Sequence, residues 1–152
     1  MRLGGTPLVY VLTLVNTAIL SGVKEKLIKS GAVGLMSGAI ALILFGCSSL
    51  RHALFQSGAF DLGIYDQVVY LISQGQPPIS SFLGFHHMGN HAAWAVYPLG
   101  LLYKIYPDVH WLLAVQAGAL TIGALPTWHL ARQAGLTVRQ AEAMAVVYLL
   151  YP

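Results

Sequence analysis

"GAVGLMSGAIALILFGCSSL", residues 31–50, is the stretch that decides the fold, because none of its twenty residues carries a charge. At about 1.5 Å per residue, a helix of this length reaches about 30 Å, the thickness of the hydrocarbon core of a bilayer. The whole chain has 57% hydrophobic and only 9% charged residues, whereas soluble domains carry about 25% charged residues. We therefore expect an all-α integral membrane protein with a transmembrane helix at residues 31–50.

A second full-length apolar run, "VHWLLAVQAGALTIGALPTWHLA", covers residues 109–131 and is followed by two arginines within residues 132–140. Three lysines precede the first run, within residues 24–29. Basic residues close to a transmembrane helix stay on the cytoplasmic side. The two runs therefore predict a cytoplasmic loop at residues 132–140 and an extracytoplasmic loop at residues 51–108.

Two further helices are expected inside the outer loop. Stepping 100° per residue through residues 62–74 gathers the apolar side chains on one arc and the polar side chains on the other, which predicts an amphipathic helix. Residues 92–106 are apolar but too short to span and contain Pro98 and Lys104. Both segments are expected to lie at the membrane surface.

The two ends of the chain are less regular. Residues 1–30 hold a run at 8–23 that is either an extra short span or a signal-like segment, followed by the basic cytoplasmic segment. Residues 141–152 begin another apolar helix that stops too early to span, which indicates a truncated transmembrane helix and an N-terminal fragment of a longer chain. Gly34 and Gly38 form a G-x-x-x-G pair that either supports close helix packing or is coincidental.

The stretch "FDLGIYDQ", residues 60–67, contains two of the five acidic residues of the chain. Asp66 falls in the middle of the polar arc of the predicted helix 62–74, so contact with water explains it fully. Asp61 precedes the first helical turn and projects toward the apolar side. Either it caps the helix N-terminus, where a carboxylate contributes about 0.5–2 kcal/mol, or it has a functional role.

Three histidines, His86, His87 and His91, follow in the stretch "FHHMGNH" of the outer loop. The i, i+4 spacing of His87 and His91 would suit a zinc site on a helix, but Gly89 and Asn90 between them favour a turn. Three interpretations stay open: interfacial histidines without a ligand, contacts to a substrate phosphate, or a loose divalent-metal site that also uses Asp61.

Two stretches resemble the GT-C class of membrane glycosyltransferases: "FDLGIYDQVVYLISQGQPP" and "NHAAWAVYPLGLLYKIYPDVHWLLAVQAGALTIGALPTWHLARQAG". They are most similar to an uncharacterised bacterial family of predicted multi-span membrane proteins related to that class. The resemblance covers residues 32–152. It implies the N-terminal part of a GT-C-like helical bundle in the bacterial plasma membrane, acting on a sugar linked to a polyprenyl phosphate.

The resemblance also implies site residues. The essential acid of the first outer loop in that class falls on Asp61, and the loop histidine of the family falls on His91. We expect Asp61 to be the catalytic base and His91 a substrate contact. From their places in the outer loop, Asp66 and Arg51 are two further candidate substrate contacts, and the cofactor is unknown, with a divalent metal as the candidate. The fragment by itself is expected to be inactive.

A different class of function remains open: a non-catalytic membrane protein, such as a transporter piece or an assembly subunit, in which Asp61 only caps a helix. In either case the lipid bilayer is the expected partner. A nucleic-acid partner is not expected, because the basic residues are scattered and form no stripe interleaved with aromatic side chains.

Overall fold

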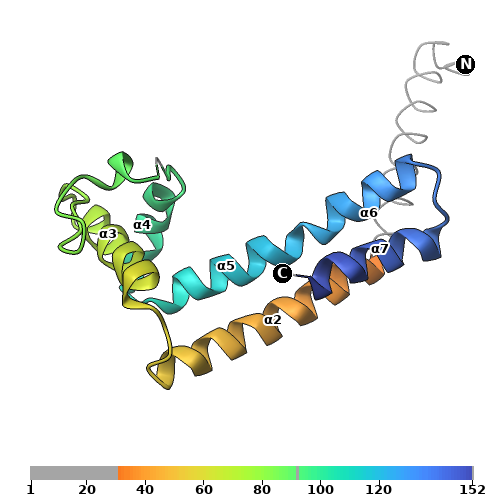
Figure 1. The fold of residues 1–152 in the computed structure, drawn as a ribbon, viewed down its shortest axis with the longest axis horizontal. Coiled ribbons are helices and arrows are strands. Elements are labelled where there is room, and N and C mark those ends of the chain that lie inside the picture. Colours follow the sequence, from red (N-terminus) through yellow and green to blue (C-terminus); the bar gives the residue numbers. More distant parts are fainter. Residues whose placement is uncertain (1–30, 92, 152) are drawn as a thin grey trace, which may run out of the picture. The chain divides into compact units, whose positions relative to one another are not determined.

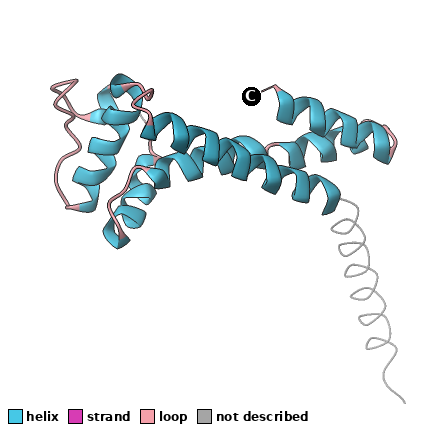
Figure 2. Ribbon diagram, turned by 90° about the horizontal axis from the view of Figure 1, so that it is seen from below, coloured by secondary structure: helices cyan, strands magenta, loops and turns pink. Residues whose placement is uncertain are grey.

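The computed structural model describes residues 31–91 and 93–151, and helices and loops make up these residues (Figure 1, Figure 2). Within them no strand forms; one isolated antiparallel bridge joins Ile79 to His86. The expected all-α fold is confirmed for this part of the chain, while the run at 8–23 and the lysines at 24–29 lie outside it. The elements are α2 (Gly31–Ala53), η1 (Ala59–Gly63), α3 (Ile64–Ser73), η2 (His87–Gly89), α4 (Val96–Ile105), α5 (His110–Ile122), α6 (Ala124–Gln133) and α7 (Val138–Leu150).

Two helical segments are long and apolar enough to cross a membrane. The first is α2, with 23 residues, and the second is His110–Gln133, with 24 residues, which joins α5 and α6 across Gly123. They fall on the runs predicted at residues 31–50 and 109–131. Their lengths fit a single crossing at about 1.5 Å per residue, and the side of the membrane on which each end lies remains a prediction.

The described residues fall into two compact units. We call residues 31–38 and 122–151 the hairpin unit, and residues 39–91 and 93–121 the loop unit. The chain passes from one unit to the other within α2 and again near the end of α5. Each unit has its own cluster of buried side chains, so each is described separately.

In the hairpin unit, α6 and α7 form an antiparallel pair joined by a short turn (Figure 1). Thr137 caps α7 through a capping box with Gln140, so the helix begins at Val138 and not at residue 141. The expected loop 132–140 is correspondingly short, because α6 continues to Gln133. The buried core of this unit consists of Val33, Ala124, Trp128, Ala141 and Ala145.

Small side chains let these helices approach closely. A Cβ atom on Gly123 would overlap the ring and hydroxyl of Tyr148 on α7, so a larger residue at this contact would force the Tyr148 side chain to move. By contrast, a Cβ on Gly34 or Gly38 would meet nothing within 4 Å. Within the described residues, close packing therefore uses Gly123 and not the G-x-x-x-G pair that the sequence suggested.

In the loop unit, α3 packs alongside α4 (Figure 1). Gly100 of α4 lies so close to α3 that an added Cβ would come 2.7 Å from Cγ2 of Ile72. Both helices are shorter than the predicted segments 62–74 and 92–106, because irregular turns precede each of them. The buried core consists of Ile64, Val68, Val69, Val96 and Tyr103.

Candidate functional site: a cavity beside a π-helical turn

A cavity of about 650 Å³ lies within the loop unit and is lined by residues from α2, η1, α3, α4 and α5. Most of the wall is apolar and includes several leucines, such as Leu44, Leu99 and Leu112. A volume of this size falls within the range of ligand sites, which are mostly apolar with a few polar groups. The polar lining residues are Ser48, Arg51, Ser57, Asp61 and Gln116.

Asp61 reaches this cavity because it lies in the middle of a π-helical turn, Ala59–Gly63. The residue at the N-cap of α3 is Gly63, and no side chain caps that helix. The interpretation of Asp61 as a helix cap is therefore wrong. Among the described residues its exposed carboxylate has no hydrogen-bond or ionic partner. π-Helical turns are rare and occur frequently at functional sites.

Arg51 lies in the last turn of α2 and lines the same cavity. Its Nη2 atom donates to the carbonyl oxygen of Gln56 at 3.5 Å, a long contact that leaves most of the five guanidinium donors available. The structure thus brings two of the predicted site residues, Asp61 and Arg51, to one cavity. Lys104, the other basic residue of the outer loop, is exposed and does not line it.

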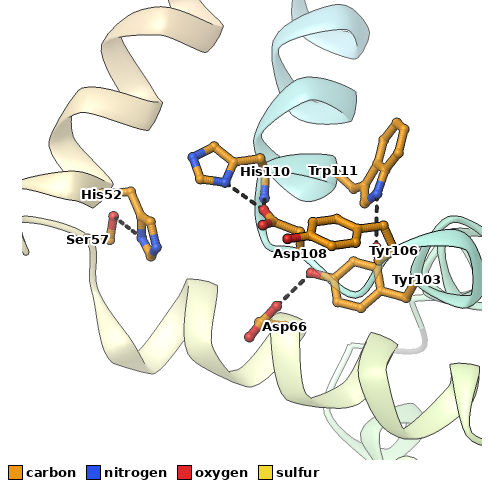
Figure 3. Close-up of polar contacts among 8 residues, drawn as sticks. All are labelled: His52, Ser57, Asp66, Tyr103, Tyr106, Asp108, His110 and Trp111. Carbon is orange, nitrogen blue, oxygen red and sulfur yellow. Dashed lines mark hydrogen bonds and ion pairs between the residues drawn. The ribbon is translucent and has the colours of Figure 1, made fainter.

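Asp66 is not solvated as the helical projection predicted. Its carboxylate is half-buried, and its Oδ1 atom accepts a hydrogen bond of 2.6 Å from the hydroxyl of Tyr103 on α4 (Figure 3). Burial, and then this hydrogen bond, raise the pKa of Tyr103 far above its usual value, so the phenol stays protonated. The prediction failed because a projection of one helix cannot show that a second helix covers its polar arc.

The two aspartates also line different cavities. Asp66 lines a smaller one, of about 290 Å³, together with His52 and Ser57. Ser57 and Leu62 line both cavities. Gly58 also lines both, so these three residues form the shared wall, with Asp61 on the larger cavity and Asp66 on the smaller one.

A second polar contact lies at the start of α5 (Figure 3). The Oδ1 atom of Asp108 accepts hydrogen bonds from the backbone N–H of His110, at 2.8 Å, and from its ring Nδ1, at 2.6 Å. The first of these bonds is the main reason that the pKa of Asp108 lies below its usual value. The ring of His110 meets the ring of His52 edge-on at 5.9 Å, and His52 contacts Ser57. The sequence analysis did not single out Asp108, although an Asp two residues before a helix is a common capping signal.

The three histidines of the outer loop do not form a common site. His86 and His91 are exposed, whereas His87 is fully buried. No group of three or more His, Cys, Asp or Glu side chains that could hold a metal occurs in residues 31–91 and 93–151. The metal site suggested for Asp61, His87 and His91 is therefore not formed by the described residues, and His91 does not line the larger cavity.

Gln67 is a further residue whose role the sequence did not reveal. Its side-chain oxygen accepts three hydrogen bonds, from the Ser80 hydroxyl at 3.0 Å, the Ser81 N–H at 2.9 Å and the Ser81 hydroxyl at 3.1 Å. Gln67 therefore ties the loop after α3 to the helix itself. A polar residue on a predicted polar arc gives no signal for such a long-range contact.

Comparison with known proteins gives a family but no activity. No curated protein and no solved structure matches the chain. The family described as "Predicted membrane protein (DUF2079)" matches residues 51–152, which include Asp61, Arg51 and the loop after α3. Since this match covers most of the chain and agrees with the two apolar helices of spanning length, the protein belongs to the DUF2079 family of predicted membrane proteins.

Proposed function

We propose that this chain forms part of a bacterial membrane glycosyltransferase of the GT-C type, which transfers a sugar from a polyprenyl phosphate in the plasma membrane. The observation that carries the proposal is the larger cavity, in which an unpaired carboxylate, Asp61, and a guanidinium, Arg51, share a wall that is otherwise mostly apolar. The apolar wall suits a lipid stem, and the two charged groups suit the phosphate and the sugar.

The proposed chemistry assigns one role to each charged group. Asp61 takes the proton of the acceptor hydroxyl while the oxygen of that hydroxyl bonds to the anomeric carbon of the sugar. The bond from that carbon to the phosphate oxygen breaks, the electron pair stays on that oxygen, and the phosphate leaves still attached to its polyprenyl chain. Arg51, on the wall of the same cavity, binds the phosphate through paired N–H donors. In this proposal the loop 51–108 faces the extracytoplasmic side.

His91 and Asp66 have a weaker place in the proposal. Neither lines the larger cavity, and Asp66 is already bound to Tyr103. His91 remains a predicted substrate contact through the family resemblance, and Asp66 remains one through its place in the outer loop. The alternative of a non-catalytic membrane protein had relied on Asp61 as a helix cap, and that cap is not formed.

The first test is Asp61→Asn in the protein as it occurs in its own membranes, prepared as vesicles and supplied with a panel of polyprenyl-phosphate hexoses and pentoses. Removal of a general base lowers transfer about 10²- to 10⁴-fold. Because the Asp61 carboxylate makes no hydrogen bond with the described residues, the free energy of unfolding should change by less than about 0.5 kcal/mol. Sugar transfer is measured by release of polyprenyl phosphate.

Asp66→Asn is the matched control, since it removes an acidic group that lies in the other cavity. Its effect on transfer should be less than tenfold. Equal transfer by Asp61→Asn and the unmodified chain would contradict the catalytic role. If the unmodified protein in its own membranes transfers sugar from none of the donors in the panel, the proposed function itself is contradicted.

A further inference from the structure

The loop that follows α3 is fastened to the helices beneath it. We call residues 76–91 the strap. It begins after Gly75, whose φ of 69° favours glycine, and folds back on itself through the bridge between Ile79 and His86. The three hydrogen bonds to Gln67 hold its middle against α3. The strap is thus folded onto α3 and is not a free loop.

The strap also packs against η1 and α3, two of the five elements whose residues line the larger cavity, although no residue of the strap itself lines it. The ring of Phe82 packs on the ring of Phe60 at 6.3 Å, next to Asp61 in the π-helical turn. It also lies 3.7 Å from the position of a Cβ on Gly63, the last residue of that turn. The ring of His87 meets the ring of Tyr65 edge-on at 5.2 Å, and Tyr65 lines the cavity.

His87 is the unusual part of this contact. Its side chain has 0% exposure, and neither ring nitrogen has a hydrogen-bond partner. A buried imidazole without a partner is tolerated only in its neutral form, because an isolated buried charge is far more costly than a buried neutral polar group. In this position the ring holds the strap closed only while it carries no second proton.

We propose that the attachment of the strap to α3 is controlled by pH: the strap is closed onto α3 when His87 is neutral, and it detaches from α3 when His87 takes a proton. The detached strap gives the imidazolium access to water, which the closed strap denies. Opening removes the contacts of Phe82 with the π-helical turn and of His87 with Tyr65. That the opening changes catalysis at Asp61 rests on the proposed function, whereas the opening itself does not.

The two other histidines of the strap favour this direction, and no group that faces His87 opposes it. From α3 the facing titratable group is the phenol of Tyr65, and from the strap itself the facing groups are His86 and His91. Burial, then His91 and then His86, lower the pKa of His87 from its usual value of 6.5. None of these groups supplies a negative charge that would accept the second proton at neutral pH.

The sign of the pH effect follows from this lowered pKa. Above about pH 6.5 the ring is neutral in both the closed and the open strap, so the closed state keeps its full stability. As the pH falls below this value, the open strap binds a proton that the closed strap does not. The ratio of closed to open strap then falls about tenfold for each pH unit, until the pKa of the closed state is reached.

Hydrogen exchange measured by mass spectrometry on the full chain in detergent micelles tests whether the strap detaches as the pH falls. The amides to follow are those of His87, which donates to the carbonyl of Pro78 at 2.9 Å, and of Leu83 and Gly84, which both donate to Ser80. After division by the intrinsic exchange rate, their protection should be constant from pH 8 to 6.5. It should fall about tenfold between pH 6 and pH 5, while protection in α7 stays constant.

His87→Phe keeps a ring at this position but cannot take a proton, so the protection of the strap should no longer depend on pH. His91→Asn is the matched control, because it removes an exposed histidine and leaves His87 in place: the pH dependence should persist and begin at a higher pH, since the charge of His91 no longer lowers the pKa of His87. If His87→Phe does not fold, Gln67→Leu provides a second measurement: it should lower protection at every pH and keep the slope. A pH-independent strap in the unmodified chain, or an unchanged slope in His87→Phe, would overturn the inference.

Discussion

The hairpin unit and the loop unit differ in the kinds of side chains that they bury. The core of the hairpin unit consists of alanines, a valine and Trp128, and no group in it titrates in the physiological range. The loop unit buries His87 and Ser80, places Asp66 against Tyr103, and surrounds a cavity of about 650 Å³. Buried polar groups lower stability unless they are hydrogen-bonded. The hairpin unit also buries a polar atom without a partner, Trp128 Nε1, but the loop unit is the one that buries a titratable side chain and surrounds the cavity, and this is where the candidate site lies.

This difference predicts that the two units respond to different kinds of substitution. A unit held by close contacts of small residues is sensitive to added volume, whereas a unit held by polar contacts is sensitive to the loss of a single donor or acceptor. Three substitutions, in order of decreasing expected effect, test this contrast.

Gly123→Val should have the largest effect on stability, because the added side chain overlaps the ring of Tyr148. Overpacking of this kind costs about 3 kcal/mol in free energy of unfolding. Thermal unfolding in detergent measures the loss. Gly118→Ala is the control, since nothing lies within 4 Å of its Cβ position and alanine favours a helix over glycine. Equal stability of the two variants would argue against close packing of α6 and α7.

Tyr103→Phe should follow, with a loss of about 1.5 kcal/mol, because it removes the donor to Asp66 while keeping the buried ring. The half-exposed position of Asp66 keeps the effect near the lower end of the range for charged acceptors. Chemical unfolding monitored by tyrosine and tryptophan fluorescence measures the change. Tyr106→Phe, at an exposed ring, should change stability by less than about 0.5 kcal/mol, and a larger change there would blur the contrast.

Asp108→Ala should have the smallest effect, about 1 kcal/mol, through loss of the bond to the first backbone N–H of α5. The pKa of Asp108 is lowered from 3.8, so its contribution is complete above that pH and is lost as the pH falls further. Solvent exposure of the carboxylate limits the effect. The free energy of unfolding is measured for the variant and the unmodified chain at pH 7 and at pH 2.5, and the two should differ only at pH 7. A difference that persists at pH 2.5 would exclude the ionised carboxylate as its cause.

The sequence predicted the features that depend on local composition. Both spanning helices fall where uncharged runs of sufficient length occur, and α3 and α4 form where apolar side chains recur with helical spacing. Asp61 and Arg51 were predicted as site residues and do share a cavity. Their catalytic and binding roles remain predictions.

The features that the sequence did not predict depend on contacts between distant segments. The solvent predicted around Asp66 is partly replaced by Tyr103, which lies on another helix. The caps of α3 differ from the prediction because a π-helical turn inserts an irregular segment before it. The burial of His87 and the three bonds to Gln67 arise only when the strap folds onto α3. Periodicity describes one helix at a time and cannot show these contacts.

The π-helical turn at Ala59–Gly63 also has a consequence for length variation among related chains. Deleting one of the two residues that follow Asp61 in this turn would let the regular α-helix extend backward from Ile64, with better backbone geometry than the rare π-helical form. Every side chain before the deletion would then rotate by about 100° relative to α3. The Asp61 carboxylate would still be present, but it would no longer face the cavity. A single-residue deletion is therefore a change that leaves the helix intact, or even lengthens it, and removes the site.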